Sequence, residues 1–417
     1  MYIGARKYTT YNTFINICAY LLVSIFLIKE INLIYFLLSF VVLMIFYIFN
    51  VFSMERGRFT LIDIINALVA NGVAVIITFR EFELKNSISI FLILYLWQNI
   101  SKGFIYKLFV KRKSVMIVGD NENASILRSI LFEKQNYQIA EELKPKDYEN
   151  FEKLITDKEI GKLIITETID EKSFTDTILR LKLKGIQVFD FISFYEKIEE
   201  KVPVLSINND YILFGSGYDI LHATLDQRIK RLFDLILAFI VGLVTSPIMI
   251  IAAVIVKLES KGPVFFKQSR IGLGNEAFQI YKFRSMRVHD ENTHSRYAQD
   301  KDNRITRFGN FMRKTRIDEL PQLWNVIKGD MSFIGPRAEW DKLCKEYEEK
   351  IPFYDIRHSV KPGLTGWAQV RYPYGMGVED ALEKLRYDLY YIKHQNLAFD
   401  IMILFQTVKI VIFGRGK

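Results

Sequence analysis

Four apolar runs near the start of the chain constrain its fold more than any other feature of the sequence. They lie at about residues 11–28, 33–52, 61–79 and 88–109. At about 1.5 Å per residue, each could cross a hydrocarbon core of about 30 Å as a helix. Basic residues gather before the first run, between the second and third, and after the fourth. The positive-inside rule therefore predicts a four-helix transmembrane region over residues 1–112, with both of its ends in the cytosol.

Composition supports a membrane protein and excludes several other classes. Hydrophobic residues make up 50% of the chain, and the net charge of +9 is not accompanied by a nucleic-acid-binding motif. We therefore expect anionic lipids and nucleotide phosphates as partners, and no nucleic acid. The only cysteines, Cys18 and Cys344, provide neither a disulfide framework nor a zinc site.

Residues 113–215 have the pattern of a small α/β domain that opens like a Rossmann-type unit. The expected strands and helices are residues 115–119, 124–134, 162–166, 172–184 and 185–190. The first strand is followed by Gly-Asp-Asn-Glu-Asn-Ala instead of G-x-G-x-x-G, which places acids where a pyrophosphate would lie. We expect a domain without cofactor that acts as a scaffold or pairs two copies into a homodimer, with nucleotide sensing as the alternative.

A fifth apolar stretch, at about residues 229–258, has basic residues on both sides and contains Ser246 and Pro247 near its middle. Proline removes a backbone hydrogen bond, and a serine hydroxyl can bond to a carbonyl that this releases, so we expect a kinked helix. A straight span would place one basic flank outside, against the positive-inside bias. A re-entrant helix that enters and leaves on the cytosolic side keeps both flanks in place, and a plain fifth span is the alternative.

Basic residues are concentrated in the part of the chain that follows. Residues 278–286 are expected to form a strand, in which successive side chains point to opposite faces. This places Lys282 and Arg284 on one face. Either these cations meet phosphates or they form a solvated strand face. Arginine forks bind phosphate oxygens in bidentate fashion, and the basic excess that continues to Arg337 suits two phosphorylated substrates or lipid headgroups.

Asp318 and Glu319 stand at the expected entrance of a helix that runs from Gln322 to Lys328, with Pro321 in its first turn. Paired carboxylates among arginines suit a carboxylate nucleophile that attacks phosphorus. We expect the neighbouring cations to keep Asp318 ionised at neutral pH. The alternative is that this pair only caps a helix.

Two further motifs follow the carboxylate pair in order, Asp-Met-Ser-Phe-Ile-Gly-Pro-Arg at 330–337 and Lys-Pro-Gly-Leu-Thr-Gly-Trp-Ala-Gln-Val at 361–370. With them, residues 226 to 413 resemble the bacterial sugar transferases, the monotopic polyprenyl-phosphate phosphoglycosyl transferases. The upstream part resembles the long members of that family in layout only, with membrane spans before a Rossmann-like domain.

The resemblance implies an activity and a cofactor. Asp318 would attack the sugar-bearing phosphorus of a UDP-sugar, release UMP, and pass the sugar phosphate to polyprenyl phosphate. Mg²⁺, held in part by Asp318, would offset the repulsion between the anions. Glu319 would orient or deprotonate the lipid phosphate. Such an enzyme would prime the assembly of an exopolysaccharide or another surface glycan.

The resemblance also implies substrate-binding residues. The loop at 361–370, with Lys361 and Thr365, is similar to the loop near the nucleotide in this family. Arg371 matches a phosphate-recognition position, although Val-Arg-Tyr-Pro-Tyr-Gly departs from the commoner Asn-Gly-Arg pattern. Asp388 matches an acidic position, with a salt bridge as the alternative. The basic candidates for binding the two phosphorylated substrates are Arg270, Lys282, Arg284, Arg316 and Arg337.

We thus expect a membrane α bundle plus α/β architecture: four transmembrane helices, a Rossmann-like domain at 113–215 and a transferase domain at 226–417 with a re-entrant helix. Residues 397–413 are apolar but interrupted by charge, which favours a helix in the plane of the membrane. The catalytic part would face the cytosol from a bacterial cytoplasmic membrane. The alternatives are a membrane sensor with an inactive transferase domain and a processive glycosyltransferase.

Overall fold

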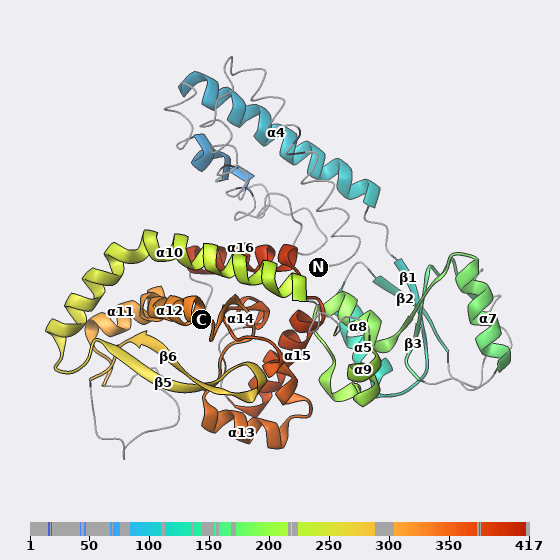
Figure 1. Cartoon of the computed structure of the whole chain (residues 1–417). Coiled ribbons are helices and arrows are strands. Elements are labelled where there is room, and N and C mark those ends of the chain that lie inside the picture. Colours follow the sequence, from blue (N-terminus) through green and yellow to red (C-terminus); the bar gives the residue numbers. More distant parts are fainter. Residues whose placement is uncertain are drawn as a thin grey trace. The chain divides into compact units, whose positions relative to one another are not determined.

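A computed structural model shows how the chain folds (Figure 1). It describes residues 16, 18, 42, 46, 67–68, 70–75, 84–109, 113–134, 137–143, 154–155, 158–167, 172–215, 218, 224–287, 304–372, 375 and 377–413. The chain divides into two compact units, Met1–Glu200 and Lys201–Lys417, and each is described by itself. The first three predicted membrane spans lie almost entirely outside the described residues.

The fourth predicted span is helical in the structure. It corresponds to α4 (Leu84–Phe109), in which Leu92, Leu96 and Ile100 are exposed. The side-chain amide of Asn71 donates to Gln98 of α4 at 2.7 Å, so one polar pair is satisfied inside this apolar region. That α4 crosses a membrane stays a prediction.

The α/β part of the first unit contains one parallel sheet. Its strands lie in the order β2-β1-β3-β4, and each neighbouring pair is parallel. The elements are β1 (Lys113–Val118), α5 (Glu122–Glu133), β2 (Tyr137–Leu143), β3 (Lys162–Ile165), α7 (Lys172–Leu183), β4 (Gln187–Asp190) and α8 (Phe191–Glu199). The predicted β-α-β pattern is present, and β2 and α8 are additions to it.

Charged side chains meet beyond the carboxyl ends of β1 and β2, close to where the order of the strands reverses. Arg128 of α5 pairs with Asp120 and with Glu142, each at 2.9 Å. Asn121 caps α5 by accepting from the backbone N–H of Ala124. Asp120 and Asn121 of the Gly-Asp-Asn-Glu-Asn-Ala segment therefore make local contacts. That this domain binds no cofactor stays a prediction.

The second unit is mixed α and β. Strands β5 (Phe265–Ile271) and β6 (Ala277–Phe283) form an antiparallel hairpin, and β7 (Ser332–Ile334) pairs in parallel with β8 (Gly363–Thr365). The helices are α9 (Asn209–Phe214), α10 (Thr224–Glu259), α11 (Arg307–Thr315), α12 (Leu323–Lys328), α13 (Asp341–Lys350), α14 (Trp367–Arg371), α15 (Val378–Lys393) and α16 (Leu397–Phe413). Short 3-10 turns, η2 (Val204–Ser206), η4 (Leu273–Asn275), η6 (Ile317–Gln322) and η7 (Tyr354–Ser359), complete the unit. Its core is centred on large buried side chains such as Trp367, Tyr354 and Tyr391.

Helix α10 is bent within its length (Figure 1), and it contains the predicted break at Ser246 and Pro247. Pro247 has no N–H to offer to the carbonyl of Leu243, four residues before it. The hydroxyl of Ser246 donates to that carbonyl at 2.8 Å. The predicted local role of the serine is thereby confirmed.

Both halves of α10 are attached to the same unit. In the first half, the buried carboxylate of Asp234 accepts from the hydroxyl of Ser332 and the N–H of Phe333, each at 3.0 Å. In the second half, Ala252 and Val256 pack against Phe283 and Met312. Both halves of α10 therefore pack on the same compact unit. That α10 enters and leaves a membrane on one side stays a prediction.

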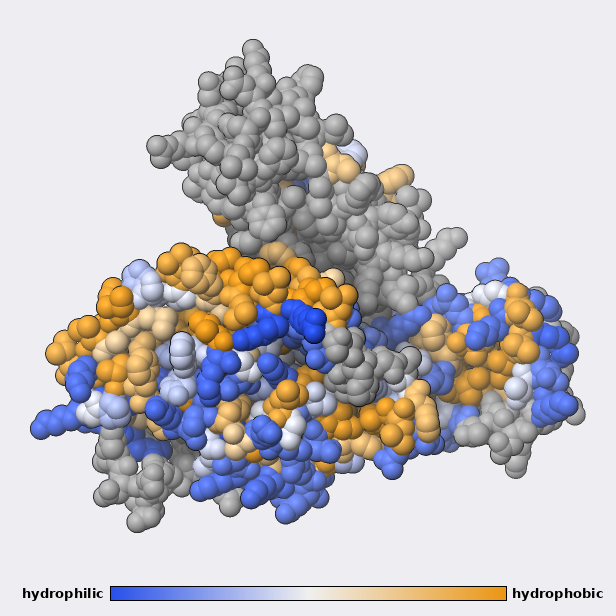
Figure 2. Space-filling view, in the orientation of Figure 1, coloured by the Kyte–Doolittle hydropathy of each residue, from blue (hydrophilic) through white to orange (hydrophobic). Residues whose placement is uncertain are grey.

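The face of α10 that points away from the unit is apolar. Among the described residues, Leu225–Glu259 is the one helical segment long and apolar enough to cross a membrane. Figure 2 shows this apolar surface over α10. Its exposed side chains include Leu232, Ile236, Phe239, Ile240, Leu243, Val244, Ile248, Ile250, Ile251 and Val254. An exposed patch of this extent indicates contact with a membrane or a partner.

Helix α16 is fixed to α10 by a buried ion pair. Asp400 accepts from Lys230 of α10 at 2.7 Å and from the hydroxyl of Tyr391 at 2.8 Å. The charge that interrupts this apolar helix is therefore neutralised inside the second unit. Its placement in the plane of a membrane stays a prediction.

Candidate active site

The paired carboxylates lie in the 3-10 turn η6, next to β6. Arg316 ends α11 in the left-handed conformation, with φ of 59°, and so turns the chain into η6. The side chains of Asp318 and Glu319 are buried, with 8% and 9% of their surface exposed. The helix that follows, α12, begins only at Leu323, and Gly329 caps its end. The predicted position of Pro321 in the first helical turn is therefore wrong, because a separate tight turn comes first.

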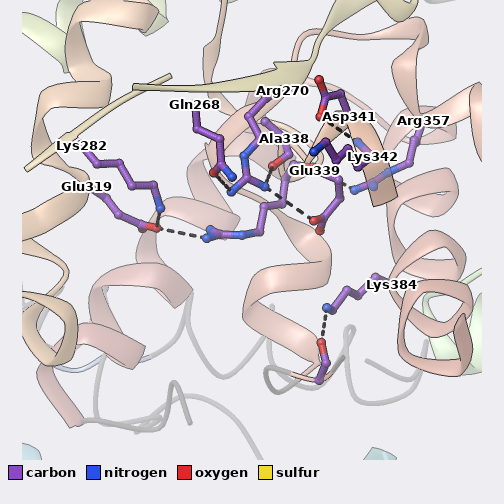
Figure 3. Close-up of polar contacts among 12 residues, drawn as sticks. Gln268, Arg270, Lys282, Glu319, Ala338, Glu339, Asp341, Lys342, Arg357 and Lys384 are labelled. Atoms are coloured by element: carbon purple, nitrogen blue, oxygen red, sulfur yellow. Dashed lines mark hydrogen bonds and ion pairs between the residues drawn. The ribbon is translucent and has the colours of Figure 1, made fainter. Parts of the chain in front are cut away.

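Glu319 is surrounded by cations. Its Oε1 atom accepts from Lys282 Nζ at 2.8 Å and from Arg337 Nη2 at 3.1 Å, and Arg316 lies 3.5 Å from Oε2. Figure 3 shows Lys282 and Glu319 pointing toward one another. Burial alone would raise the pKa of Glu319, but Lys282, Arg337 and Arg316 outweigh it and hold the pKa well below its usual range. Glu319 is thus a fixed negative charge that holds two half-buried cations in place.

Asp318 has a different environment from its neighbour. Its Oδ1 atom is buried and accepts no hydrogen bond from any residue that the structure describes. Burial and the adjacent charge of Glu319 raise the pKa of Asp318, and Lys282, Arg313 and Arg316 offset only part of this rise. The neighbouring cations thus act on the pKa of Asp318 in the expected direction, although burial outweighs them. That Asp318 is ionised at neutral pH stays a prediction.

Three glycines bring Arg337 to the carboxylates. A Cβ added to Gly363 would lie 2.1 Å from the backbone nitrogen of Gly335, and one added to Gly366 would lie 2.0 Å from the Gly335 oxygen. Only glycine allows the backbones after β7 and around β8 to approach so closely. This contact explains the turn formers in both motifs without assigning them to a substrate, and it fixes the start of the Gly-Pro-Arg segment.

Arg357, which was not among the predicted site residues, supports the backbone of Arg337. Its Nη2 atom donates to the Arg337 carbonyl at 3.0 Å and to Asp388 at 2.8 Å, while Nη1 donates to the Tyr354 hydroxyl at 2.6 Å. Burial raises the pKa of Asp388 to about 6 against the effect of Arg357. Asp388, a predicted substrate-binding residue, is here the salt-bridge partner that was its alternative.

Two predicted arginines have protein partners of their own. The Nη atoms of Arg284 donate to the carbonyls of Ser260 and Lys261, just beyond the end of α10. Arg270 of β5 donates to the carbonyl of Ala338 at 3.2 Å and to Gln268 at 2.7 Å (Figure 3). Arg284 lies one residue past the end of β6, and its side chain meets the end of α10, whereas Lys282 meets Glu319. That the two cations meet phosphates together stays a prediction.

The residues of the loop at 361–370 contact different parts of the second unit. The Thr365 hydroxyl is 2.7 Å from that of Thr407 in α16. The guanidinium of exposed Arg371 lies over the Trp367 ring, 5.0 Å from its centre. Lys361 lies beside Gly329 at the end of α12. Of the predicted binding residues, the structure therefore brings Lys282, Arg316 and Arg337 to the paired carboxylates.

A hard cation fits the free oxygen of Asp318. Mg²⁺ commonly binds through one or two carboxylates, with waters and substrate phosphates as its other ligands. No group of three or more metal-ligating side chains occurs among the described residues. Asp318 would thus hold such an ion together with substrate, and not in a protein cage.

Comparisons with known proteins agree with this geometry. The family model described as "Bacterial sugar transferase" matches residues 225–414, which contain the whole site. The chain is 42% identical over 239 residues to "UDP-N-acetylgalactosamine-undecaprenyl-phosphate N-acetylgalactosaminephosphotransferase" of Aeromonas hydrophila, covering 57% of this chain and 55% of that protein. It is 39% identical over 227 residues to "UDP-glucose:undecaprenyl-phosphate glucose-1-phosphate transferase" of Escherichia coli K12, covering 53% and 46%.

A third relative is matched along nearly its whole length. The "Exopolysaccharide production protein PSS" of Rhizobium leguminosarum bv. phaseoli is 42% identical over 200 residues, which cover 46% of this chain and 99% of that protein. The chain thus spans about half the length of the first two relatives and almost all of the third. It belongs to the bacterial sugar transferase family.

Proposed function

We propose that this protein transfers a sugar 1-phosphate from a UDP-sugar to a polyprenyl phosphate and releases UMP. The observation that carries the proposal is the free carboxylate oxygen of Asp318, buried beside the group formed by Glu319, Lys282 and Arg337. A nucleophile needs an unpaired oxygen, and its phosphorylated substrate needs nearby cations. The printed names of two relatives specify UDP-sugars and undecaprenyl phosphate.

In the first step, a carboxylate oxygen of Asp318 forms a bond to the sugar-bearing phosphorus. The bond from this phosphorus to the bridging oxygen breaks, and UMP leaves with the electron pair. In the second step, a phosphate oxygen of the polyprenyl carrier attacks the same phosphorus and restores the Asp318 carboxylate. Lys282, Arg316 and Arg337 are the cations placed to stabilise charge on the phosphoryl oxygens. Mg²⁺ bound to Asp318 would supply further compensation for the negative charge of both substrates.

Glu319 acts in this proposal by positioning cations. A carboxylate whose pKa is held well below its usual range is a weak base. Glu319 accepts hydrogen bonds from Lys282 and Arg337. These two cations are therefore already held in place when a phosphate binds. Positioning these cations is a role beside the two expected for Glu319, and its low pKa argues against deprotonation of the lipid phosphate.

The protein would work on the cytosolic side of a bacterial cytoplasmic membrane. α10 would enter the bilayer as a re-entrant helix, because its outer face is apolar while both of its halves bind one compact unit. The apolar runs before residue 110 would add the predicted multi-pass anchor. In this arrangement a polyprenyl tail stays in the lipid while its phosphate reaches Asp318.

The nucleotide product tests the reaction. The full chain is reconstituted in nanodiscs with undecaprenyl phosphate and a panel of UDP-sugars. UMP release supports the proposal, UDP release indicates a processive glycosyltransferase, and no turnover with any donor indicates a sensor.

Two aspartate variants test the nucleophile. Asp318→Asn is expected to abolish UMP release while the protein still melts cooperatively, because an amide is a poor nucleophile for phosphorus. Asp355→Asn, which changes an exposed acid of η7, is the matched control and should retain activity. Quenched protein should carry a sugar phosphate adduct on Asp318, and substantial turnover by Asp318→Asn would exclude the mechanism.

A further inference from the structure

A second pair of cations converges at the end of α12. A Cβ built on Gly329 would lie 3.5 Å from Arg231 Nη2 and 3.8 Å from Lys361 Nζ. Gly329 has φ of 100°, a conformation that strongly favours glycine, so the space between the two cations stays open. Arg231 comes from the first half of α10, and Lys361 precedes β8. Three separate segments thus form one small cationic site, which we call the Gly329 site.

The charges of the Gly329 site are only partly compensated. Arg231 donates to the carbonyls of Val326 and Ile327 at 2.6 and 2.8 Å, which leaves other N–H groups of its guanidinium available. The ammonium of Lys361 makes no hydrogen bond or ion pair with any residue in the described part of the chain. Burial and the charge of Arg231 lower the pKa of Lys361. Two cations that repel each other in this way would be stabilised by a shared anion.

The nearby carboxylates are already bound to other groups. Asp234 accepts from Ser332 and from the N–H of Phe333. Asp330 accepts from Lys328 at 3.0 Å and from the amide of Asn325 at 3.3 Å. Both acids raise the pKa of Lys361 through their charge, and no ion pair joins either of them to Lys361 in the described part of the chain. A phosphate, with oxygens about 2.8 Å from each donor, could bridge Arg231 and Lys361 over Gly329.

Exposed apolar side chains lie on the same two helices as the Gly329 site. Leu232 follows Arg231 and is 60% exposed, while Trp324 and Ile327 of α12 are 56% and 44% exposed. Helices α10 and α12 pack against each other, so these side chains continue the apolar outer face of α10. Figure 2 shows hydrophilic residues directly beneath that apolar surface. Cations next to exposed tryptophan and aliphatic groups are typical of the interface between lipid tails and headgroups.

We propose that Arg231 and Lys361 bind the phosphate of a membrane lipid over Gly329, with the lipid chain against the apolar surface of α10 and α12. The site is distinct from the paired carboxylates, where Lys282, Arg313 and Arg316 are the cations that act most on Asp318. Lys361 therefore serves the lipid and not the nucleotide. The inference rests on the proposed attachment to the membrane and does not depend on the proposed reaction.

Lipid retention tests the Gly329 site without any turnover. The full chain is incorporated in nanodiscs of phosphatidylcholine with phosphatidylglycerol, released by mild detergent, and weighed by native mass spectrometry. Lys361→Gln should retain about five-fold less phosphatidylglycerol than the unaltered chain, the effect of one basic residue at a lipid surface. Lys361→Arg should restore retention, and Lys345→Gln, an exposed lysine of α13, should not change it.

Two further measurements make the result decisive. Lys361→Gln should melt within a few degrees of the unaltered chain, and Lys361→Met is a second neutral variant if the glutamine disturbs the fold. Equal retention of phosphatidylglycerol by the unaltered chain and a folded neutral variant would overturn the proposal. Added undecaprenyl phosphate that displaces phosphatidylglycerol one for one would assign the site to the carrier lipid. Retention of phosphatidylglycerol despite the carrier would assign it to the bulk phospholipid.

Discussion

At the scale of single residues, the site depends on the different surroundings of two adjacent carboxylates. Glu319 has three cationic neighbours and a low pKa, whereas the Oδ1 atom of Asp318 bonds to no described residue and the pKa of Asp318 is raised. The peptide bond between them lies in a tight turn, so that one side chain meets β6 and the Arg337 segment. Sequence alone shows the pair of acids and cannot show this division.

Glu319→Gln is expected to damage both stability and activity. The neutral amide leaves the half-buried Lys282 and Arg337 without their shared anion, and we expect a loss of stability of about 2 to 3 kcal/mol, below the range for fully buried pairs. UMP release should fall by about two orders of magnitude because the cations lose their positions. The control is Glu346→Gln, which removes an exposed pair with Lys350 worth about 0.5 kcal/mol or less. Chemical unfolding and initial rates measure the two effects, and near-equal values for both variants would contradict this role.

His358 is expected to destabilise the protein in acid. Burial and the charge of Arg357 lower the pKa of His358 to about 3, against about 6.5 in the unfolded chain. Below pH 6.5, His358 therefore binds a proton in the unfolded state but not in the folded state. The free energy of unfolding falls progressively between pH 6.5 and pH 3. In His358→Leu this contribution is absent, so its melting temperature should fall less steeply from pH 7 to pH 4.5. Parallel curves for the two proteins would show that His358 does not titrate in this way.

At the scale of elements, α10 is the feature whose topology can be tested most directly. Leu225, Val244 and Leu258 are exposed near its start, middle and end. In a chain with Cys18 and Cys344 replaced, cysteine at Leu225 and at Leu258 should react with an impermeant maleimide from the same side of sealed vesicles. Cysteine at Val244 should be protected by lipid. Labelling of the two ends from opposite sides would instead establish a membrane-crossing span.

The contact between β7 and β8 should tolerate no side chain at Gly363. A methyl group there would come within 2.1 Å of the Gly335 nitrogen, so the backbones would separate and displace Arg337. We expect Gly363→Ala to lower stability by about 2 kcal/mol or more and to reduce UMP release. Gly242→Ala is the control, since its methyl would meet only Leu323 at 4.0 Å. Equal melting temperatures for the two variants would show that the contact adjusts freely.

How well each element could be predicted from sequence follows from its length and burial. β1 and β3 are predicted because strands buried in a parallel sheet form apolar runs. β2 is missed because Glu141 and Glu142 interrupt its apolar pattern at the edge of the sheet, and β7 and β8 have only three residues each. Arg357 is missed because it lies in a 3-10 turn, while its partner Asp388 is 31 residues away in the chain.

At the scale of the whole molecule, the division into two units separates the site from the α/β sheet. Asp318, Glu319 and their cationic partners all lie in Lys201–Lys417, within the part that the family match covers. The parallel sheet with Arg128, Asp120 and Glu142 lies in Met1–Glu200. Pairing of two copies through that sheet stays a prediction, as does nucleotide sensing as its alternative.

The second unit is therefore expected to act without the first. It has its own core of buried side chains, and the Rhizobium leguminosarum relative is matched over 99% of its length by 46% of this chain. Residues 201–417, inserted in nanodiscs through α10 and α16, should release UMP at a rate within about an order of magnitude of the full chain, because domains with separate cores generally fold alone. Asp318→Asn in the same truncated chain provides the background rate. A folded fragment that binds nanodiscs but releases no UMP would show that Met1–Glu200 contributes to the active site or to its assembly. The second unit would then fold independently but would not be active without the first.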